Sequence, residues 1–193
     1  PAVCNLYGTV DRIKFIFRDS IPAVENILKA KIEPDAFLQN PLKTLSLLGP
    51  AFKGLPKQLS PNKAPATWKK TSIDQLPATV SWPMDGGRFI TLPQVFSREL
   101  GSKGLMKSNL GMYRIQLTGN DYKLNDEIGL HYQIHRGIGV HHQEHLDANK
   151  PFRVSIFVGG PPANTFAAVL PLPEGLPEVT FAGMMAGKRF RYT

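Results

Sequence analysis

Apolar residues follow two different patterns in the N-terminal stretch of the chain. The runs 2–7 and 13–17 are rich in strand-forming residues and predict short strands. Between residues 21 and 28, apolar side chains recur at helical spacing, directly after Asp19 and Ser20, which are good helix N-caps. The pattern therefore predicts a strand at the start of the chain, followed by a short helix.

The middle of the chain predicts a second helix, an exposed connection and then a region of strands. Apolar periodicity over 37–48 favours the helix, and prolines spread through 50–68 indicate a linker. From about Leu76, short β-branched and aromatic runs alternate with glycines. These runs lie at 79–82, 88–91, 112–117, 128–134 and 152–158. Their spacing is typical of a β-barrel or sandwich, with one helix at 162–169 packed on its side.

Net charge and cysteine content help to decide which kinds of function we expect. The chain carries 23 Lys and Arg against 15 Asp and Glu, a formal net charge of +8. The basic residues fall in ones and twos without interleaved aromatics, so we expect no nucleic-acid partner. Cys4 alone cannot form an internal disulfide, which suits a reducing cytoplasm, and no apolar run approaches the roughly 20 residues of a membrane span. The chain opens at Pro1 without a signal peptide or a natural start, so we expect both ends to be cut.

A group of histidines is the first candidate for chemistry. All five lie within fifteen residues, at His131, His135, His141, His142 and His145. If 140–148 is helical, His141 and His145 share a face that could bind a metal ion, but their order with Glu144 is not that of a zinc-protease helix. A solvated helix is the favoured interpretation. His131 and His135 fall on one face of a predicted strand over 129–136, where one of them can line a pocket.

Two further segments carry polar groups that a ligand could use. Asn109 and Arg114 stand five residues apart at the mouth of a predicted strand. An Arg fork matches phosphate or carboxylate, and an Asn oxygen suits a hard cation, although a surface position is the favoured interpretation for Arg114 taken alone. Prolines stiffen 171–178, and there Glu178 is better placed to reach inward than Glu174, which we expect to face water.

These segments, taken in order, resemble the UbiD family of carboxy-lyases, and most of all its bacterial polyprenyl-hydroxybenzoate decarboxylases. The strings that carry the resemblance are Val-Cys-Asn-Leu-Tyr-Gly-Thr at 3–9, Asn-Leu-Gly-Met-Tyr-Arg at 109–114, His-Arg-Gly at 135–137, Gly-Gly-Pro-Pro-Ala at 159–163, and Pro-Leu-Pro-Glu-Gly at 171–175, leading to Phe-Ala-Gly at 181–183. The resemblance implies an α+β, mainly β fold. A partial N-terminal α/β domain and Pro-rich linker would occupy 1–68. A split β-barrel, like that of FMN-binding flavin reductases, would occupy 69–193, without the family's C-terminal oligomerisation domain.

The resemblance also implies a prenylated FMN site. A divalent ion of the Mn²⁺ type, often with K⁺, would bridge the cofactor phosphate to Asn109, His135 and Glu178. Mixed oxygen and imidazole ligands suit Mn²⁺. Cofactor contacts would fall on Met112, Tyr113, Arg114, His131, Tyr132, Gln133, Arg136 and Gly137. Arg114 would also be catalytic, orienting the reacting carboxylate while paired with a family glutamate.

The implied activity is non-oxidative decarboxylation of an aromatic or unsaturated carboxylic acid, such as a polyprenyl-4-hydroxybenzoate in quinone biosynthesis. A cytoplasmic homo-oligomer would perform it, a flavin prenyltransferase would supply the cofactor, and a lipophilic substrate would bring the protein to the membrane surface. The family's acidic proton donors fall beyond Thr193, so we expect the fragment to be inactive alone. The alternative is a flavin-binding or flavin-reductase-like module without decarboxylase activity, which needs no metal triad on the phosphate.

Overall fold

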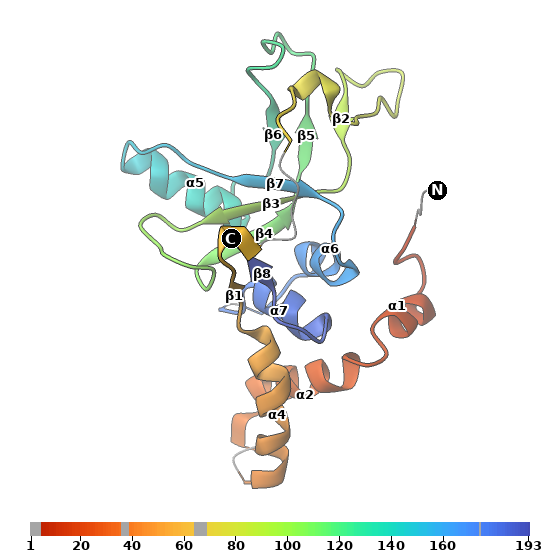
Figure 1. Cartoon of the computed structure of the whole chain (residues 1–193), viewed down its shortest axis with the longest axis vertical. Coiled ribbons are helices and arrows are strands. Elements are labelled where there is room, and N and C mark those ends of the chain that lie inside the picture. Colours follow the sequence, from red (N-terminus) through yellow and green to blue (C-terminus); the bar gives the residue numbers. More distant parts are fainter. Residues whose placement is uncertain (1–4, 36–38, 64–68, 174) are drawn as a thin grey trace.

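The computed structural model describes residues 5–35, 39–63, 69–173 and 175–193, and combines helices with short strands (Figure 1). In chain order the helices are α1 (Val10–Ile16), α2 (Ile21–Ile32), α4 (Pro41–Gly54), α5 (Gly137–Asp147), α6 (Pro162–Val169) and α7 (Glu178–Met185), with 3₁₀ turns η1 (Pro61–Lys63) and η2 (Ile73–Gln75). The strands are β1 (Lys57–Gln58), β2 (Phe89–Ile90), β3 (Pro93–Arg98), β4 (Ser108–Met112), β5 (Arg114–Gln116), β6 (Gly129–His131), β7 (Ser155–Val158) and β8 (Arg191–Tyr192). Within the described ranges, no helix has both the length and the apolar character needed to cross a bilayer.

Residues 10–16 form helix α1, so the strand predicted over 13–17 was wrong. The Thr9 side chain caps α1 by accepting a hydrogen bond from the Arg12 backbone N–H at 3.2 Å, and Asp11 adds a negative charge to the first turn. Ile13 and Phe17, four residues apart, then join the same core cluster. Of the run predicted over 2–7, residues 2–4 lie outside the described residues, and Asn5 to Tyr7 lead into a turn.

The next two helices follow the sequence prediction more closely. The helix expected at 21–28 is confirmed as α2, and Ser20 precedes it. The Ser20 hydroxyl donates to the carbonyl of Met185 at 2.7 Å, which ties the start of α2 to the end of α7. Helix α4 begins later than predicted and runs through Pro50 into the expected linker. Residues 37, 38 and 64–68 of these predictions lie outside the described residues.

Within the described residues the strands form three small sheets, ordered β1-β8, β2-β5-β6 and β4-β3-β7. Strand β3 is the centre of the last sheet and pairs antiparallel with β4 and β7. Strands β4 and β5 are separated by Tyr113 alone, yet β4 pairs with β3 while β5 pairs with β2 and β6. The chain therefore changes sheets at Tyr113.

The α+β mixture is confirmed, but the prediction of a mainly β fold is wrong for the described residues, where helices outweigh the short strands, and the split β-barrel is not confirmed. Among the described residues no closed barrel forms, because strands of two to six residues that change partners at Tyr113 do not give one continuous ladder. The predicted run at 79–82 contributes only an isolated bridge from Thr79 to Phe89. The boundary at residue 68 stays a prediction.

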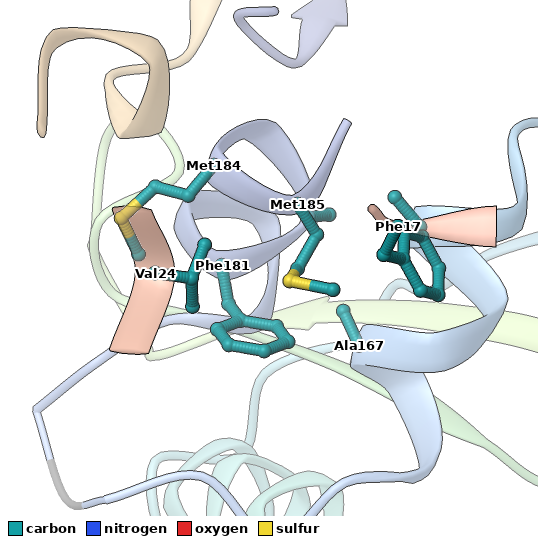
Figure 2. Packing of buried hydrophobic residues seen from close by; sticks show 8 residues of the cluster. Phe17, Val24, Ala167, Phe181, Met184 and Met185 are labelled. Atoms are coloured by element: carbon teal, nitrogen blue, oxygen red, sulfur yellow. The ribbon is translucent and has the colours of Figure 1, made fainter. Parts of the chain in front are cut away.

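Helices α6 and α7 lie between the N-terminal helices and the β4-β3-β7 sheet (Figure 1). Figure 2 shows Phe181 and Met185 of α7 gathered with Phe17, Val24 and Ala167 in the main core cluster. A second cluster lies at the sheets and contains Val95, Ile115, Leu117 and Ile138. A third joins Leu105 and Leu110 to Val179 of α7. This third cluster fixes the start of α7 against β4, and so positions Glu178 beside 109–110.

Candidate functional site

The junction of β4 and β5 is the centre of the candidate site. Gly111 leaves room there for the Tyr113 side chain, because a Cβ at this position would lie 2.4 Å from Cε2, Cζ and Oη of Tyr113 and would displace the ring. With glycine in place, the ring folds back over the end of β4. The Tyr113 hydroxyl then accepts a hydrogen bond from Asn109 Nδ2 at 3.3 Å. The glycine of the Asn-Leu-Gly-Met-Tyr-Arg string thus serves the local packing of the site.

A cavity of about 370 Å³ opens on one side of this junction. Its lining residues are Gly111, Met112, Tyr113, Arg114, His131, Tyr132, Gln133, Arg136, Ala168 and Val169. Seven of the eight predicted cofactor contacts lie in this lining, and Gly137 is the exception. The register of the β5-β6 pair, which sets Arg114 opposite His131, explains why segments distant in sequence meet here. We call this space the polar cavity.

A second cavity of about 360 Å³ also opens at this junction. It is lined by Ser81, Trp82, Phe89, Ile90, Thr91, Leu92 and Pro93, and again by Met112, Tyr113 and Arg114. Most of these side chains are apolar, so we call this space the apolar cavity. Met112, Tyr113 and Arg114 line both cavities, and we call this shared wall the partition.

Arg114 is held from two directions at this partition. Its guanidinium carbon lies 3.9 Å from the centre of the Phe89 ring. Its Nη2 donates to Asp85 Oδ1 at 2.9 Å. Sequence reasoning missed Asp85 and expected a family glutamate as the partner of Arg114. An Asp directly before two glycines does signal a turn in which the carboxylate bonds to nearby backbone, but not its long-range partner.

Asp85 is itself fixed by its loop. Its Oδ2 accepts hydrogen bonds from the backbone N–H groups of Ser81 at 3.0 Å and Trp82 at 3.1 Å. Burial works against ionisation of Asp85, but the N–H groups of Trp82 and Ser81 and the Arg114 guanidinium outweigh it and hold the pKa of Asp85 below its ordinary value. Asp85 is therefore a charged acceptor at neutral pH.

Two of the three predicted metal ligands are neighbours. Glu178 is the first residue of α7, and its Oε2 accepts a hydrogen bond from the Leu110 backbone N–H at 3.1 Å, next to Asn109. Burial raises the pKa of Glu178, while its own N–H and that of Leu110 act in the opposite direction. Burial also raises the pKa of Tyr113, and the negative charge of Glu178 adds to this effect. A carboxylate destabilised by burial gains from a bound cation, so the chemistry of this pair fits a metal ligand.

His135 lies in a turn and not in a strand, because β6 ends at His131. It is exposed and contributes to a hollow formed with α5, outside the lining of the polar cavity. Two residues later, Gly137 lies against the Asn109 amide, so close that a Cβ there would be 2.3 Å from Oδ1. The structure thus brings the turn that carries His135 beside Asn109. That Asn109, His135 and Glu178 share one ion stays a prediction.

His141, His142 and His145 lie on α5. We predicted a solvated helix, but these three side chains are half-buried. His141 Nδ1 is 3.0 Å from Ser97 Oγ, and His142 Nδ1 hydrogen bonds the Tyr132 hydroxyl. The His142 ring also stacks on Phe152, with centroids 5.0 Å apart. In the part of the chain that the structure describes, no three His, Cys, Asp or Glu side chains gather as a metal cluster. The helix is confirmed, and its histidines serve packing.

Known proteins are similar to this chain in sequence and in fold. The family model described as UbiD, 3-octaprenyl-4-hydroxybenzoate carboxy-lyase Rift-related domain, matches residues 57–193. A Chlamydia pneumoniae protein, named as a subunit of 4-hydroxybenzoate decarboxylase, is 32% identical over 201 residues, covering 100% of this chain and 32% of the relative. An uncharacterized Archaeoglobus fulgidus protein is 32% identical over 202 residues, covering 100% and 39%. The chain spans about a third of the length of these curated relatives.

Solved structures support the fold. The apo 3,4-dihydroxybenzoic acid decarboxylase AroY of Klebsiella pneumoniae superposes with a TM-score of 0.63 at 20% identity, over 97% of this chain and 36% of that protein. The UbiD-class enzyme HmfF of Pelotomaculum thermopropionicum, solved with prFMN, gives a TM-score of 0.59 at 20% identity, over 74% and 34%. The family model covers most of the chain, including the β4-β5 junction, both cavities and Glu178, and on that evidence the chain belongs to the UbiD family.

Proposed function

We propose that the protein of which this chain is part catalyses non-oxidative decarboxylation of an aromatic or unsaturated carboxylic acid, of the polyprenyl-4-hydroxybenzoate type. The reaction uses prenylated FMN and a divalent metal ion. The observation that carries the proposal is the polar cavity, where seven of the eight residues implied by the family resemblance form one lining. UbiD-family membership supports it further. We assign the activity to the whole protein and propose that this chain alone releases no carbon dioxide.

The residues of the polar cavity fit a flavin phosphate. In its lining, Gln133 and His131 supply hydrogen-bond donors, Arg136 supplies donors and a positive charge, and the Tyr113 and Tyr132 rings supply flat apolar surface. When bound, prenylated FMN supplies the electron sink for the electrons left behind as carbon dioxide departs. In our proposal, Arg114 orients the substrate carboxylate at the partition.

The metal ion in this proposal is Mn²⁺, with K⁺ nearby, held by Asn109, Glu178 and His135. The hydrogen-bonded contact of Glu178 with the Leu110 N–H and the packing of Gly137 on Asn109 support this placement. A hard amide oxygen, a carboxylate and an imidazole suit Mn²⁺. The bound cation would offset both the phosphate charge and the buried carboxylate.

His135→Ala in the full-length protein tests the triad. We expect the purified variant to lose metal and flavin together, measured by elemental analysis and by flavin absorbance, and to release no carbon dioxide. His145→Ala is the matched control, because the ring of His145 bonds the His141 carbonyl within α5. Retention of both metal and flavin at the wild-type ratio in His135→Ala would contradict the triad.

A second candidate is a flavin-binding or flavin-reductase-like module without decarboxylase activity. The observation in its favour is that the lining of the polar cavity is complete without His135. Under this alternative, FMN affinity measured by flavin fluorescence would be unchanged by EDTA, whereas the decarboxylase proposal expects it to fall. As partners we propose a flavin prenyltransferase as cofactor source, further copies of the same chain, and the membrane surface for a lipophilic substrate.

A further inference from the structure

The Arg114 side chain is open enough to solvent that, without a partner, it could adopt many orientations. Its side chain is 54% exposed, whereas that of its partner Asp85 is 11% exposed. An arginine that is half open to solvent on a partition between two cavities can reach into either of them. Its productive direction therefore depends on the group that holds it.

We propose that Asp85 is a positioning residue, whose carboxylate holds the Arg114 guanidinium over Phe89 so that its remaining N–H donors face the bound substrate. This inference rests on the function proposed above. Asp85 acts only through Arg114, and it is distinct from the glutamate that the family resemblance implied for this pairing.

The geometry of the 81–85 turn carries the inference. One carboxylate oxygen of Asp85 is occupied by the two backbone N–H groups of Ser81 and Trp82, which leaves the other for Arg114. Because the carboxylate is anchored to backbone, its direction does not depend on the arginine. Among the described residues, Asp85 is the acid that forms an ion pair with Arg114.

The pairing leaves Arg114 able to bind a ligand. A guanidinium has five N–H donors, and the Asp85 contact engages one nitrogen, Nη2. The Phe89 ring covers one face of the guanidinium plane, which restricts rotation without using a donor. The other N–H groups keep a fixed direction at the partition, as orientation of a planar carboxylate requires.

Asp85→Asn isolates this role. The amide oxygen of Asn can still accept from Ser81 and Trp82, but the amide nitrogen then faces Arg114 and cannot accept from it. Glu99→Gln is the matched control, because it also removes one negative charge and breaks a surface ion pair of similar length, 3.0 Å to Lys107. Both variants should fold as the wild type does.

The first measurement follows the Arg114 side chain by ¹⁵N NMR of this chain, with its Nε–Hε signal assigned by its loss in Arg114→Lys. We expect slow guanidinium rotation in the wild type and in Glu99→Gln, and fast rotation in Asp85→Asn. An Arg114 signal unchanged by Asp85→Asn would overturn the inference, and it would do so whether or not the protein is a decarboxylase.

The second measurement uses carbon dioxide release by the full-length protein loaded with prenylated FMN. We expect Asp85→Asn to lower kcat at least tenfold with less than a threefold change in KM, and to cost less than twofold in the Arg114→Lys background. An equal loss in both backgrounds would show that Asp85 does not act through Arg114. A wild-type protein without turnover would refute the proposed function alone, and the NMR result would still decide the role of Asp85.

Discussion

We predict that Gly137→Ala prevents binding of the metal ion while the protein still folds. Gly137 begins α5, and it is not among the glycines with positive φ, so the backbone accepts alanine there. The new Cβ would stand 2.3 Å from Asn109 Oδ1 and 3.0 Å from its Cγ. Van der Waals repulsion forbids that approach, so the Asn109 amide must rotate away from its present position.

The cost to stability is small. An off-rotamer Asn side chain costs about 0.5–1.5 kcal/mol. Loss of the hydrogen bond from Asn109 to Tyr113 costs a further 0.5–1.5 kcal/mol or so. Alanine returns up to about 1 kcal/mol of helix propensity. The net loss is at most about 3 kcal/mol, less than the ordinary stability of a domain, about 5–15 kcal/mol.

The effect on the site is large by comparison, because a ligand oxygen moved by about 1 Å no longer reaches the ion, given metal–oxygen distances near 2 Å in such sites. We expect the full-length Gly137→Ala protein to retain less than a tenth of the wild-type manganese and flavin, by elemental analysis and flavin absorbance. Gly49→Ala is the control, since its Cβ meets nothing within 4 Å and should leave both contents unchanged. Wild-type manganese and flavin content in Gly137→Ala would refute the placement of Asn109 at the metal.

Three further predictions concern stability and charge. Phe181→Ala should lower the free energy of unfolding by about 3–5 kcal/mol in urea denaturation, because it empties part of a core where Phe181 is 4% exposed, whereas exposed Leu42→Ala should change it by less than about 0.5 kcal/mol. Burial lowers the pKa of His141 in the folded protein below that of an exposed histidine. As the pH drops through about 6.5, the unfolded chain therefore binds a proton at His141 more readily than the folded protein does, and the free energy of unfolding should fall. His141→Gln should flatten this dependence between pH 7.5 and 5.5, and an unchanged slope would exclude His141 as its source. Glu178→Gln removes a negative charge that a metal ion would use, so the affinity for manganese should fall in a titration. Because burial disfavours that charge, its removal should not lower the thermal stability.

Local signals in the sequence were sufficient where an element is determined by its own residues. The bounds of α6 match the predicted 162–169, because prolines precede a short apolar helix there. Helix α2 was also predicted, from its periodicity and the preceding Ser20. The strand predicted over 13–17 was wrong because contacts outside this segment determine its structure. Its residues favour a strand locally, but the cap at Thr9 and the core against α7 decide for a helix.

The sequence supplied a list of candidate site residues but not the geometry in which they meet. The resemblance assembled the residues that line the polar cavity, although nothing local in the sequence shows that 112–114 and 131–133 meet. The Arg114 ion pair spans 29 residues, and the contact of Glu178 with Leu110 spans 68. Such contacts arise only once α7 is packed on β4 and the 81–85 turn closes over β5. Patterns of period 2 or 3.6 therefore do not reveal them.

The partition couples the two sheets to the candidate chemistry. Met112 ends β4 in one sheet, Arg114 begins β5 in the other, and Tyr113 alone connects them. Any displacement of one sheet against the other must therefore move the wall shared by both cavities. The second core cluster opposes such a displacement, because it packs Val95 of β3 together with Ile115 of β5, both 0% exposed. The third core cluster locks β4 to α7 through Leu110 and Val179, so the apolar contact that stabilises this part of the fold also holds Glu178 beside the proposed metal site.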